Sequence, residues 1–275
     1  CGAFPSPKFA HRAPAMSLHQ SFGPDRLTLA IEGAVAVITL ARPPVNAIDD
    51  AMLDALLEAA GQVADHGSLA LLRIRSSRKG FCAGADLAMV GARVTSPTGA
   101  EDMMRSVRRF HEAYDRIAAL PVVTLAEIEA HALGGGLELA LACDLRIAAH
   151  EAKLGLPEAN VGLLPGAGGT QRLSRLWGPG VAARLILTGE LVGGAEAERL
   201  GLVQWSAPAA ELREKADQIA QRVAGLSVEA LRAAKGCIAI ASAIAPEGVK
   251  AEIEGIGALM REPSTRHRVA SFLAR

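Results

Sequence analysis

The spacing of hydrophobic residues along the chain predicts an alternating series of strands and helices. Alternating apolar and polar positions, or short apolar runs between turn residues, predict strands at residues 27–31, 34–40, 69–75, 121–128 and 145–149. Apolar positions three and four residues apart predict helices at residues 49–64, 101–120 and 134–143. Because strands and helices follow one another in turn, the pattern favours an α/β fold of repeated strand–helix units.

The pattern changes near residues 200–210, beyond which the strand signals fade. Helices are predicted there at residues 210–223, 228–241, 247–261 and 264–273. We therefore expect an α/β domain at residues 17–206 and a helical region at residues 207–275. Residues 1–16 are rich in proline and alanine and lack periodicity, so we expect a disordered extension or a cloning remnant before a natural start at Met16.

Composition and charge argue against several classes of partner. Lysine plus arginine and aspartate plus glutamate balance at 29 each, so no net field attracts a polyanion. Aromatic residues make up only 3% of the chain, which removes the usual base-stacking surfaces. No apolar run is long enough to cross a bilayer. We therefore expect neither nucleic acid nor a membrane as a partner.

The cysteines suggest a reducing compartment. Cys1, Cys82, Cys143 and Cys237 are widely separated and form no C-x-x-C pair. This spacing suits neither a disulfide framework nor a zinc site, so we expect no metal and a cytoplasmic location. Cys82 and Cys143 are expected to be small core residues, because no histidine or asparagine pattern accompanies them as it would a nucleophile.

Two glutamates are the candidate acid–base groups. Glu138 is the only charged residue in GGGLELALAC (134–143), and Glu158 is the only one in LGLPEANVGLLPGAGGTQ (154–171). Segments this apolar should be buried, and a carboxylate in a poorly solvated place can donate or take a proton near neutral pH. The alternative interpretations are a carboxylate at a helix N-terminus for Glu138 and an ion pair with Lys153 or a distant arginine for Glu158.

Two glycine-containing loops are candidates for binding an oxyanion. The segment Phe81–Asp86 and the triplet Gly134–Gly136 each follow a predicted strand, and the triplet opens a helix. Small residues let a ligand approach backbone N–H groups, and a helix N-terminus adds unpaired donors. Two such donors aimed at one oxygen would make an oxyanion hole, provided that the fold brings the loops together.

Six segments form an ordered set of motifs. They are RPPVNAI (42–48), FCAGADL (81–87), HALGGGLELALACDLRIA (131–148), LGLPEANVGLLPGAGGTQRLSRLWG (154–178), LTGELVGGAEAERLGLV (187–203) and ASFLAR (270–275). In order and spacing they resemble the enoyl-CoA hydratase/isomerase family, the crotonases, over about residues 25–275. The resemblance implies a crotonase-like spiral of ββα units, followed by C-terminal helices that assemble trimers, often paired into hexamers.

The resemblance also implies catalytic roles. The backbone N–H groups of Ala85 and Gly135 would hold the carbonyl of a coenzyme A (CoA) thioester and stabilise its enolate. Glu138 would orient and deprotonate a water, and Glu158 would supply the proton to Cα, with the two roles partly shared. The N–H of Gly166 would help to hold the water.

Binding of CoA is expected along the backbone near Ala47, Ala83 and Leu87. Because the thioester is itself the substrate, no cofactor and no metal are expected. The expected assembly is a homotrimer or a dimer of trimers. Ala88 and Met89 stand where family members often carry basic residues for the CoA phosphates, so those contacts must come from elsewhere.

Another departure from the family pattern precedes the glycine triplet. Glu129 and Ala130 stand where the family often has Asn-Gly, and His131 follows them. A structural position is expected for Glu129 rather than a third acidic group at the site. His131 is expected to be a packed histidine rather than a base. Neither departure affects the two candidate glutamates.

The expected activity is the reversible syn addition of water to a 2-trans-enoyl-CoA, giving a 3-hydroxyacyl-CoA in the degradation of fatty acids or related acyl groups. Alternatives are an enoyl-CoA isomerase, or a specialised hydratase or lyase for branched or aromatic acyl groups. A remote alternative is a non-catalytic, RNA-associating relative. Isomerisation needs one base and no bound water, so the second glutamate argues against it. The length of the acyl chain stays open.

Overall fold

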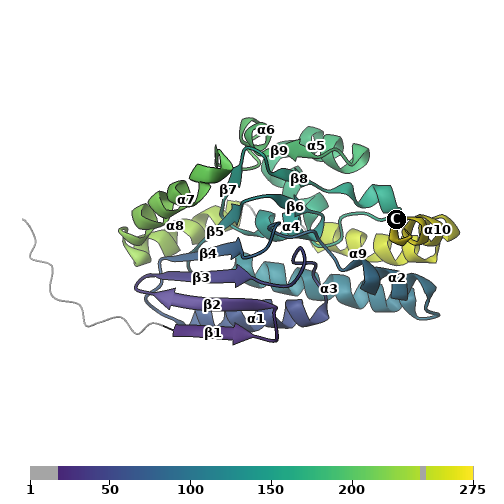
Figure 1. The fold of residues 1–275 in the computed structure, drawn as a ribbon, viewed down its shortest axis with the longest axis horizontal. Coiled ribbons are helices and arrows are strands. Elements are labelled where there is room, and N and C mark those ends of the chain that lie inside the picture. Colours follow the sequence, from purple (N-terminus) through teal and green to yellow (C-terminus); the bar gives the residue numbers. More distant parts are fainter. Residues whose placement is uncertain (1–17, 242–245, 275) are drawn as a thin grey trace, which may run out of the picture.

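The computed structural model describes residues 18–241 and 246–274 (Figure 1). The expected extension at residues 1–16 lies outside them. The strands are β1 (Leu18–Phe22), β2 (Leu27–Glu32), β3 (Val35–Leu40), β4 (Leu71–Ser76), β5 (Val123–Ile128), β6 (His131–Leu133), β7 (Leu145–Ala149), β8 (Lys153–Gly155), β9 (Val192–Gly193) and β10 (Trp205–Ala207). The helices are α1 (Asp50–Asp65), α2 (Leu87–Thr95), α3 (Gly99–Ala118), α4 (Gly135–Ala142), the 3-10 helix η1 (Pro157–Val161), α5 (Gly169–Thr188), α6 (Gly194–Arg199), α7 (Ala209–Ala224), α8 (Val228–Ala241), α9 (Pro246–Arg261) and α10 (Pro263–Leu273).

The described strands form two sheets. The larger has the order β1-β2-β3-β4-β5-β7-β10, antiparallel from β1 to β3 and parallel from β3 onward. The smaller has the order β6-β8-β9. Parallel neighbours need a crossover, and here helices supply it between β3 and β4 and between β4 and β5. The prediction of an α/β fold is confirmed.

The main core lies between the larger sheet and the helices behind it (Figure 1). Alternate residues of β2 and β3, such as Leu29 and Ile38, are buried, because successive side chains of a strand point to opposite faces. Helix α1 adds an apolar stripe that includes Met52 and Leu56, and Asp49 caps its start by accepting a hydrogen bond from the Met52 N–H. The 3.6-residue spacing thus places one face of α1 against the sheet.

A second hydrophobic cluster stands apart from this core. Its buried residues are Val90, Val94, Ala100, Met103, Val107, Val161, Leu163, Ile256, Met260 and Val269. They come from α2, the first half of α3, the segment around η1, and α9 and α10, which lie together at one end of the molecule (Figure 1). Helix α9 approaches α3 closely, since a Cβ at Gly257 would lie 2.5 Å from the Met104 sulfur. The last two helices therefore fold back over the α/β part.

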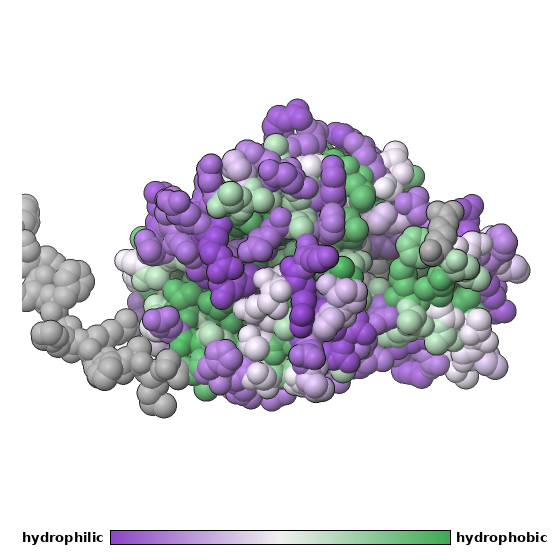
Figure 2. Space-filling view, in the orientation of Figure 1, coloured by the Kyte–Doolittle hydropathy of each residue, from purple (hydrophilic) through white to green (hydrophobic). Residues whose placement is uncertain are grey.

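Apolar side chains also reach the surface at that end. Figure 2 shows a hydrophobic patch where Figure 1 places α10. Phe272 and Leu273, at the end of α10, are each about half exposed. By contrast, α7 packs on the larger sheet at β4, β7 and β10. In the described part of the chain, no helix is both long and apolar enough to cross a bilayer.

Most long elements agree with the sequence prediction, whereas the short ones do not. The predicted helices at residues 49–64 and 101–120 correspond to α1 and α3. The prediction missed β1, α2, α5 and α6, and also the strands β6, β8, β9 and β10, each of two or three residues. A strand of three residues has too few positions to establish a period. In α5 the pair Gly178-Pro179 interrupts the helical pattern at a kink.

Two helical glycines should respond to alanine in opposite directions. A Cβ at Gly136, in α4, would lie 2.2 Å from the Cys82 carbonyl oxygen, so Gly136→Ala should lower the free energy of unfolding by roughly 1–3 kcal/mol through overpacking. Gly61, in α1, has open space there, so Gly61→Ala should raise it by about 0.5–1 kcal/mol. Urea denaturation of both variants measures the difference, and equal signs would contradict the packing argument.

Candidate active site

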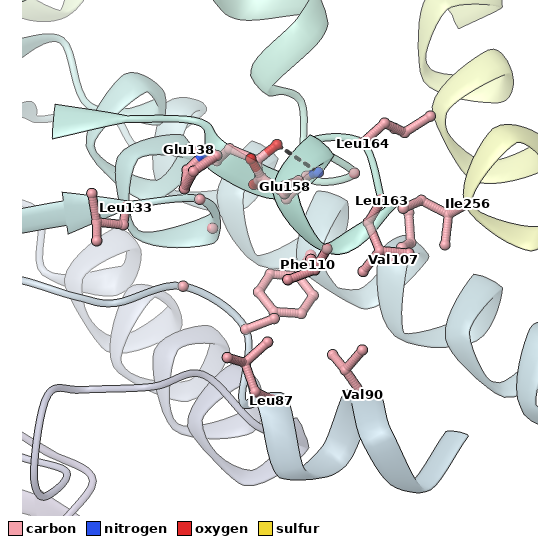
Figure 3. A pocket seen from close by; sticks show the side chains of 18 of the residues that line it. Leu87, Val90, Val107, Phe110, Leu133, Glu138, Glu158, Leu163, Leu164 and Ile256 are labelled. Carbon is pink, nitrogen blue, oxygen red and sulfur yellow. Dashed lines mark hydrogen bonds between the residues drawn. The ribbon is translucent and has the colours of Figure 1, made fainter. Parts of the chain in front are cut away.

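A cavity of about 220 Å³ lies against both hydrophobic clusters (Figure 3). Aliphatic and aromatic side chains form most of its wall: Leu87, Val90, Met103, Val107, Phe110, Leu133, Val161, Leu163, Leu164, Ile256 and Phe272. Backbone from the loop before α2 and from the start of α4 lines another part. The polar side chains among the described lining residues are those of Glu138, Glu158 and Asn160.

Glu138 projects from the first turn of α4 and is only 2% exposed. Its Oε1 accepts hydrogen bonds from the backbone N–H groups of Ala167, at 2.8 Å, and Gly169, at 2.7 Å. Figure 3 shows the carboxylate at the wall of the cavity. A Cβ at Gly169 would lie 2.8 Å from the same oxygen, so the glycine is needed for this approach. The two N–H donors fix the orientation of the carboxylate.

The turn that supplies these donors is itself held by a buried arginine. Arg172, in the first turn of α5, donates from Nη1 to the Ala167 carbonyl at 2.9 Å. Its other terminal nitrogen pairs with Asp115 of α3. The peptide groups around Ala167 are thus bonded on both sides, to Glu138 and to Arg172. Sequence reasoning did not single out Arg172; the signal available was a charged residue within an apolar, glycine-rich motif.

Glu158 approaches the cavity from a different element. It lies in η1, which ends at Val161 and is followed by Gly162 in the left-handed conformation. A Cβ at Gly134 would lie 2.8 Å from Glu158 Oε1, so the carboxylate packs directly on the backbone at the start of α4. Figure 3 shows Glu158 beside Glu138 on one side of the cavity. The structure therefore brings together the two glutamates that the sequence suggested.

The two predicted donor loops meet at the same place. Gly84 has a φ of 96°, and a Cβ there would lie 3.2 Å from the Gly135 nitrogen. A Cβ at Gly135 would lie 3.5 Å from the Ala85 nitrogen. Gly135 is the first residue of α4, so its N–H has no acceptor within the helix. Ala85 and Gly135 both line the cavity, as an oxyanion hole would require.

The hydroxyl of a buried tyrosine stabilises the start of α4. Tyr114 is fully buried in α3, and its hydroxyl donates to the Gly135 carbonyl at 2.7 Å. Burial raises its pKa well above the usual value, so the phenol keeps its proton and acts as a donor. Tyr114 is the only tyrosine of the chain and lies on the apolar face of a predicted helix. A buried hydroxyl needs a partner, and that was the signal that sequence reasoning missed.

The remaining predicted contacts divide into two groups. Ala83, Leu87 and Gly166 line the cavity, and a Cβ at Gly166 would lie 3.1 Å from Ile256. Ala47 is half-buried and does not line it. The carbonyl of Ala47 instead accepts a hydrogen bond from Arg42 Nη1 at 2.8 Å. Three of these four predicted contact residues thus border the cavity, and Ala47 lies outside it.

Neither Glu129 nor His131 lines the cavity. Glu129 lies 3.8 Å from Arg213 at the surface, which agrees with a structural position. His131 is exposed, so the expectation of a packed histidine is wrong. In β6 His131 falls on the outer face, Ala132 is fully buried and Leu133 is half-buried. Among the residues that the structure describes, no cluster of three metal-binding side chains occurs.

The two buried cysteines are core residues, as expected. Cys82 is buried next to Ala83 in the chain, and its thiol donates to the Asn46 carbonyl at 3.0 Å. Cys143 is buried at the end of α4. Burial raises the pKa of each thiol to about 12. A backbone hydrogen bond from Gly84 acts to lower the pKa of Cys82, and the charge of Arg146 acts to lower that of Cys143, but burial outweighs both. Neither thiol is suited to be a nucleophile.

An apolar cavity with two carboxylates and two convergent backbone N–H groups is suited to an enzyme that stabilises charge on a carbonyl oxygen while moving protons. Comparison with known proteins identifies the family within this class of enzymes. Residues 30–273 match the family model described as "Enoyl-CoA hydratase/isomerase". This match covers most of the chain, which therefore belongs to the enoyl-CoA hydratase/isomerase family.

Individual relatives agree with this assignment. The chain is 37% identical over 249 residues to "Probable enoyl-CoA hydratase" of Bacillus subtilis, covering 90% of this chain and 95% of that protein. It is 42% identical over 209 residues to "Probable enoyl-CoA hydratase 2, mitochondrial" of Arabidopsis thaliana, covering 75% and 68%. A solved structure of a putative enoyl-CoA hydratase from Streptomyces avermitilis superposes with a TM-score of 0.83 at 31% identity, covering 94% of this chain and 92% of that one.

The buried thiols should resist alkylation in the native protein. With a pKa of about 12, only about one thiol in ten thousand is ionised at pH 8, and burial blocks access as well. Iodoacetamide at pH 8, followed by peptide mass spectrometry, should modify Cys237, which is exposed, and leave Cys82 and Cys143 intact. Because the pKa is raised, labelling of both should increase as the pH rises toward 12. Labelling of Cys82 as fast as Cys237 at pH 8 would contradict this description.

Proposed function

We propose that this protein is an enoyl-CoA hydratase, which adds water reversibly and in syn fashion to a 2-trans-enoyl-CoA and gives a 3-hydroxyacyl-CoA. One observation carries the proposal: Glu138 and Glu158, from separate elements, border one apolar cavity beside the N–H groups of Ala85 and Gly135. Several relatives named as enoyl-CoA hydratases support it. The reaction moves water and protons but no electrons, so the proposal includes no redox cofactor and no metal.

The backbone donors would act on the thioester carbonyl. Hydrogen bonds from Ala85 and Gly135 would draw electron density onto the carbonyl oxygen and make Cβ of the conjugated chain electrophilic. When water adds to Cβ, the charge moves to the same oxygen, where fixed donors stabilise it without reorganising. Removal of one such donor typically lowers turnover by about 10²–10³-fold.

The two glutamates would move the protons. Glu138 would take a proton from the attacking water while the C–O bond forms at Cβ, and Glu158 would give its proton to Cα as the enolate collapses. The sum is one water added across the double bond. Glu138 then holds a proton and Glu158 lacks one, so the pair must exchange a proton before the next cycle. Their position side by side favours that exchange, and two close carboxylates titrate as a coupled pair.

The finer features of the proposal follow the family resemblance. The pantetheine would follow backbone at Ala83 and Leu87, and Ala47 would contact CoA beyond the cavity. Gly166 would help to position the water. The proposal also includes a role in the degradation of fatty acids or related acyl groups. It further includes a trimeric or hexameric assembly and a reducing compartment such as the cytoplasm. The cysteines Cys82, Cys143 and Cys237, all free thiols, support the reducing compartment.

The direct test is turnover of crotonyl-CoA, followed by loss of the conjugated thioester absorbance and identification of the product. A 3-trans-enoyl-CoA serves as the control, because an isomerase would convert it and a hydratase would not. Formation of 3-hydroxybutyryl-CoA supports the proposal. Isomerisation of the control without hydration of crotonyl-CoA would overturn it.

Removing either proton-transfer group should lower turnover and leave the fold intact. We expect Glu138→Gln and Glu158→Gln each to reduce kcat by about 10²–10⁴-fold, because an amide neither takes nor gives the required proton. The amide oxygen at position 138 can still accept from Ala167 and Gly169, so melting temperatures should change little. The matched control is Glu129→Gln, a nearby carboxylate outside the cavity, which should keep native kcat. Near-native kcat in either site variant would contradict the assigned roles.

The cavity wall also predicts the polarity of the acyl chain. Beyond the glutamates the described lining is almost wholly apolar, so a terminal carboxylate would be buried without a partner. We expect kcat/KM for hex-2-enoyl-CoA to exceed that for the same chain with a terminal carboxylate by about 100-fold or more. Steady-state kinetics with both substrates measure the ratio. Equal values would show that the chain end does not enter this cavity.

A further inference from the structure

The direction of the Ala85 N–H is set by a short pairing with another segment. Ile48 and Ala85 form an isolated parallel bridge. The Ile48 N–H donates to the Gly84 carbonyl at 2.8 Å, and the Asp86 N–H donates to the Ile48 carbonyl at 2.8 Å. In a parallel bridge the residue between two such bonds turns its own N–H and C=O away from its partner. The pairing therefore points the Ala85 N–H away from Ile48, on the side where Ala85 borders the cavity.

Asn46 fixes the segment that makes this bridge. Its side chain is fully buried, and its backbone has a φ of 55°, the left-handed region in which asparagine is enriched. Nδ2 donates toward three acceptors, Ser76 Oγ at 2.7 Å, the Gly80 carbonyl at 3.2 Å and the Phe81 carbonyl at 2.9 Å. The acceptors all lie on the stretch that leads into the Ala85 loop. The Asn46 side chain thus links the segment that contains Ile48 to the segment that leads to Ala85.

The identity of the amide atoms follows from these partners. Oδ1 of Asn46 is buried and has no hydrogen-bond partner among the described residues. If the amide were turned over, its oxygen would face the carbonyl oxygens of Gly80 and Phe81, which would repel it. The site therefore requires a donor at this position and cannot use an acceptor.

Arg42 adds a second link across the same bridge. Its Nη1 donates to the Ala47 carbonyl at 2.8 Å, and its Nη2 pairs with Asp86, the residue after Ala85. The other oxygen of Asp86 accepts from Ala88 and Met89 at the start of α2. Burial acts to raise the pKa of Asp86, but hydrogen bonds, first that of Arg42, outweigh it and lower the pKa. The loop is thus held on both sides of Ala85.

We propose that Asn46 is a positioning residue for the oxyanion hole: through its three hydrogen bonds it holds the bridge that aims the Ala85 N–H at the thioester carbonyl. This inference rests on the proposed function. Asn46 does not line the cavity and touches no substrate, so it acts through Ala85. Displacement of one donor by a few tenths of an ångström weakens stabilisation of the transition state more than binding of the ground state.

The decisive variant is Asn46→Asp, which keeps the shape and the preference for this backbone conformation but replaces the donor by an oxygen. Facing two carbonyl oxygens, it should push the segments apart. With crotonyl-CoA we expect kcat to fall about tenfold or more, because a displaced Ala85 N–H loses part of the stabilisation that an oxyanion-hole donor supplies. KM should change less than about threefold.

A spectroscopic readout separates positioning from general damage. Butyryl-CoA labelled with an isotope at the carbonyl carbon does not react, and the infrared stretch of its bound carbonyl falls in frequency as the hydrogen bonds strengthen. In the native protein the stretch should shift down on binding, and in Asn46→Asp the shift should be smaller. If Asn46→Asp does not fold, Asn46→Gly keeps the left-handed backbone without the donors and should show the same reduced shift.

The matched control is Thr124→Val, which removes a different buried group. Thr124 is fully buried and does not line the cavity; its hydroxyl donates to Asp144 Oδ2 at 3.0 Å and accepts from the Asp144 N–H at 2.8 Å. This variant should melt at a lower temperature yet keep the native carbonyl shift and native kcat. A native shift and kcat in a folded position-46 variant, or an equal loss in Thr124→Val, would overturn the positioning role.

Failure of the two proposals can be told apart. If the native protein neither shifts the carbonyl stretch nor hydrates crotonyl-CoA, the proposed function is wrong and the role of Asn46 falls with it. If the native protein does both and the position-46 variants do so equally well, only the positioning role is wrong.

Discussion

The site depends on a contact between two backbones with no side chain between them. The loop at residues 81–86 lies directly on the start of α4, where a Cβ at Gly136 would come within 2.2 Å of the Cys82 carbonyl oxygen. Hydrogen bonds from Cys82 to His131 and from Leu133 to Cys82 continue the contact along β6. Because glycine alone permits this distance, the backbones of Ala85 and Gly135 approach one another closely, and a Cβ at Gly135 would lie 3.5 Å from the Ala85 nitrogen.

This contact also determines where the carboxylates lie. Once the start of α4 is fixed, the first turn carries Glu138 into the apolar interior, where the turn at Ala167 and Gly169 receives it. Glu158 packs on the backbone of the same glycine segment, against Gly134. Burying a carboxylate is unfavourable unless hydrogen bonds compensate it, and here the compensation comes from backbone N–H groups. The geometry of the site is therefore largely a property of the main chain.

The sequence was a good guide to long elements and to the glutamates, and a poor one to the groups that hold them. Glu138 and Glu158 stood out because each is alone in an apolar run, a local property. The roles of Tyr114 and Arg172 depend on partners in other elements, Gly135 and Ala167, which no local pattern reveals. His131 was misread because β6 has only three residues, too few to show which of its faces is exposed.

The cavity joins two hydrophobic clusters that differ in what they can tolerate. The main core carries the sheet and α4, so a change there alters the folding of the whole chain and the chemistry together. The smaller cluster supplies much of the wall through apolar side chains such as Met103, Val107 and Ile256. Substitutions among them change the volume and shape of the cavity without removing either carboxylate. Under the proposed function, such changes would alter acyl preference in evolution while the reaction is conserved.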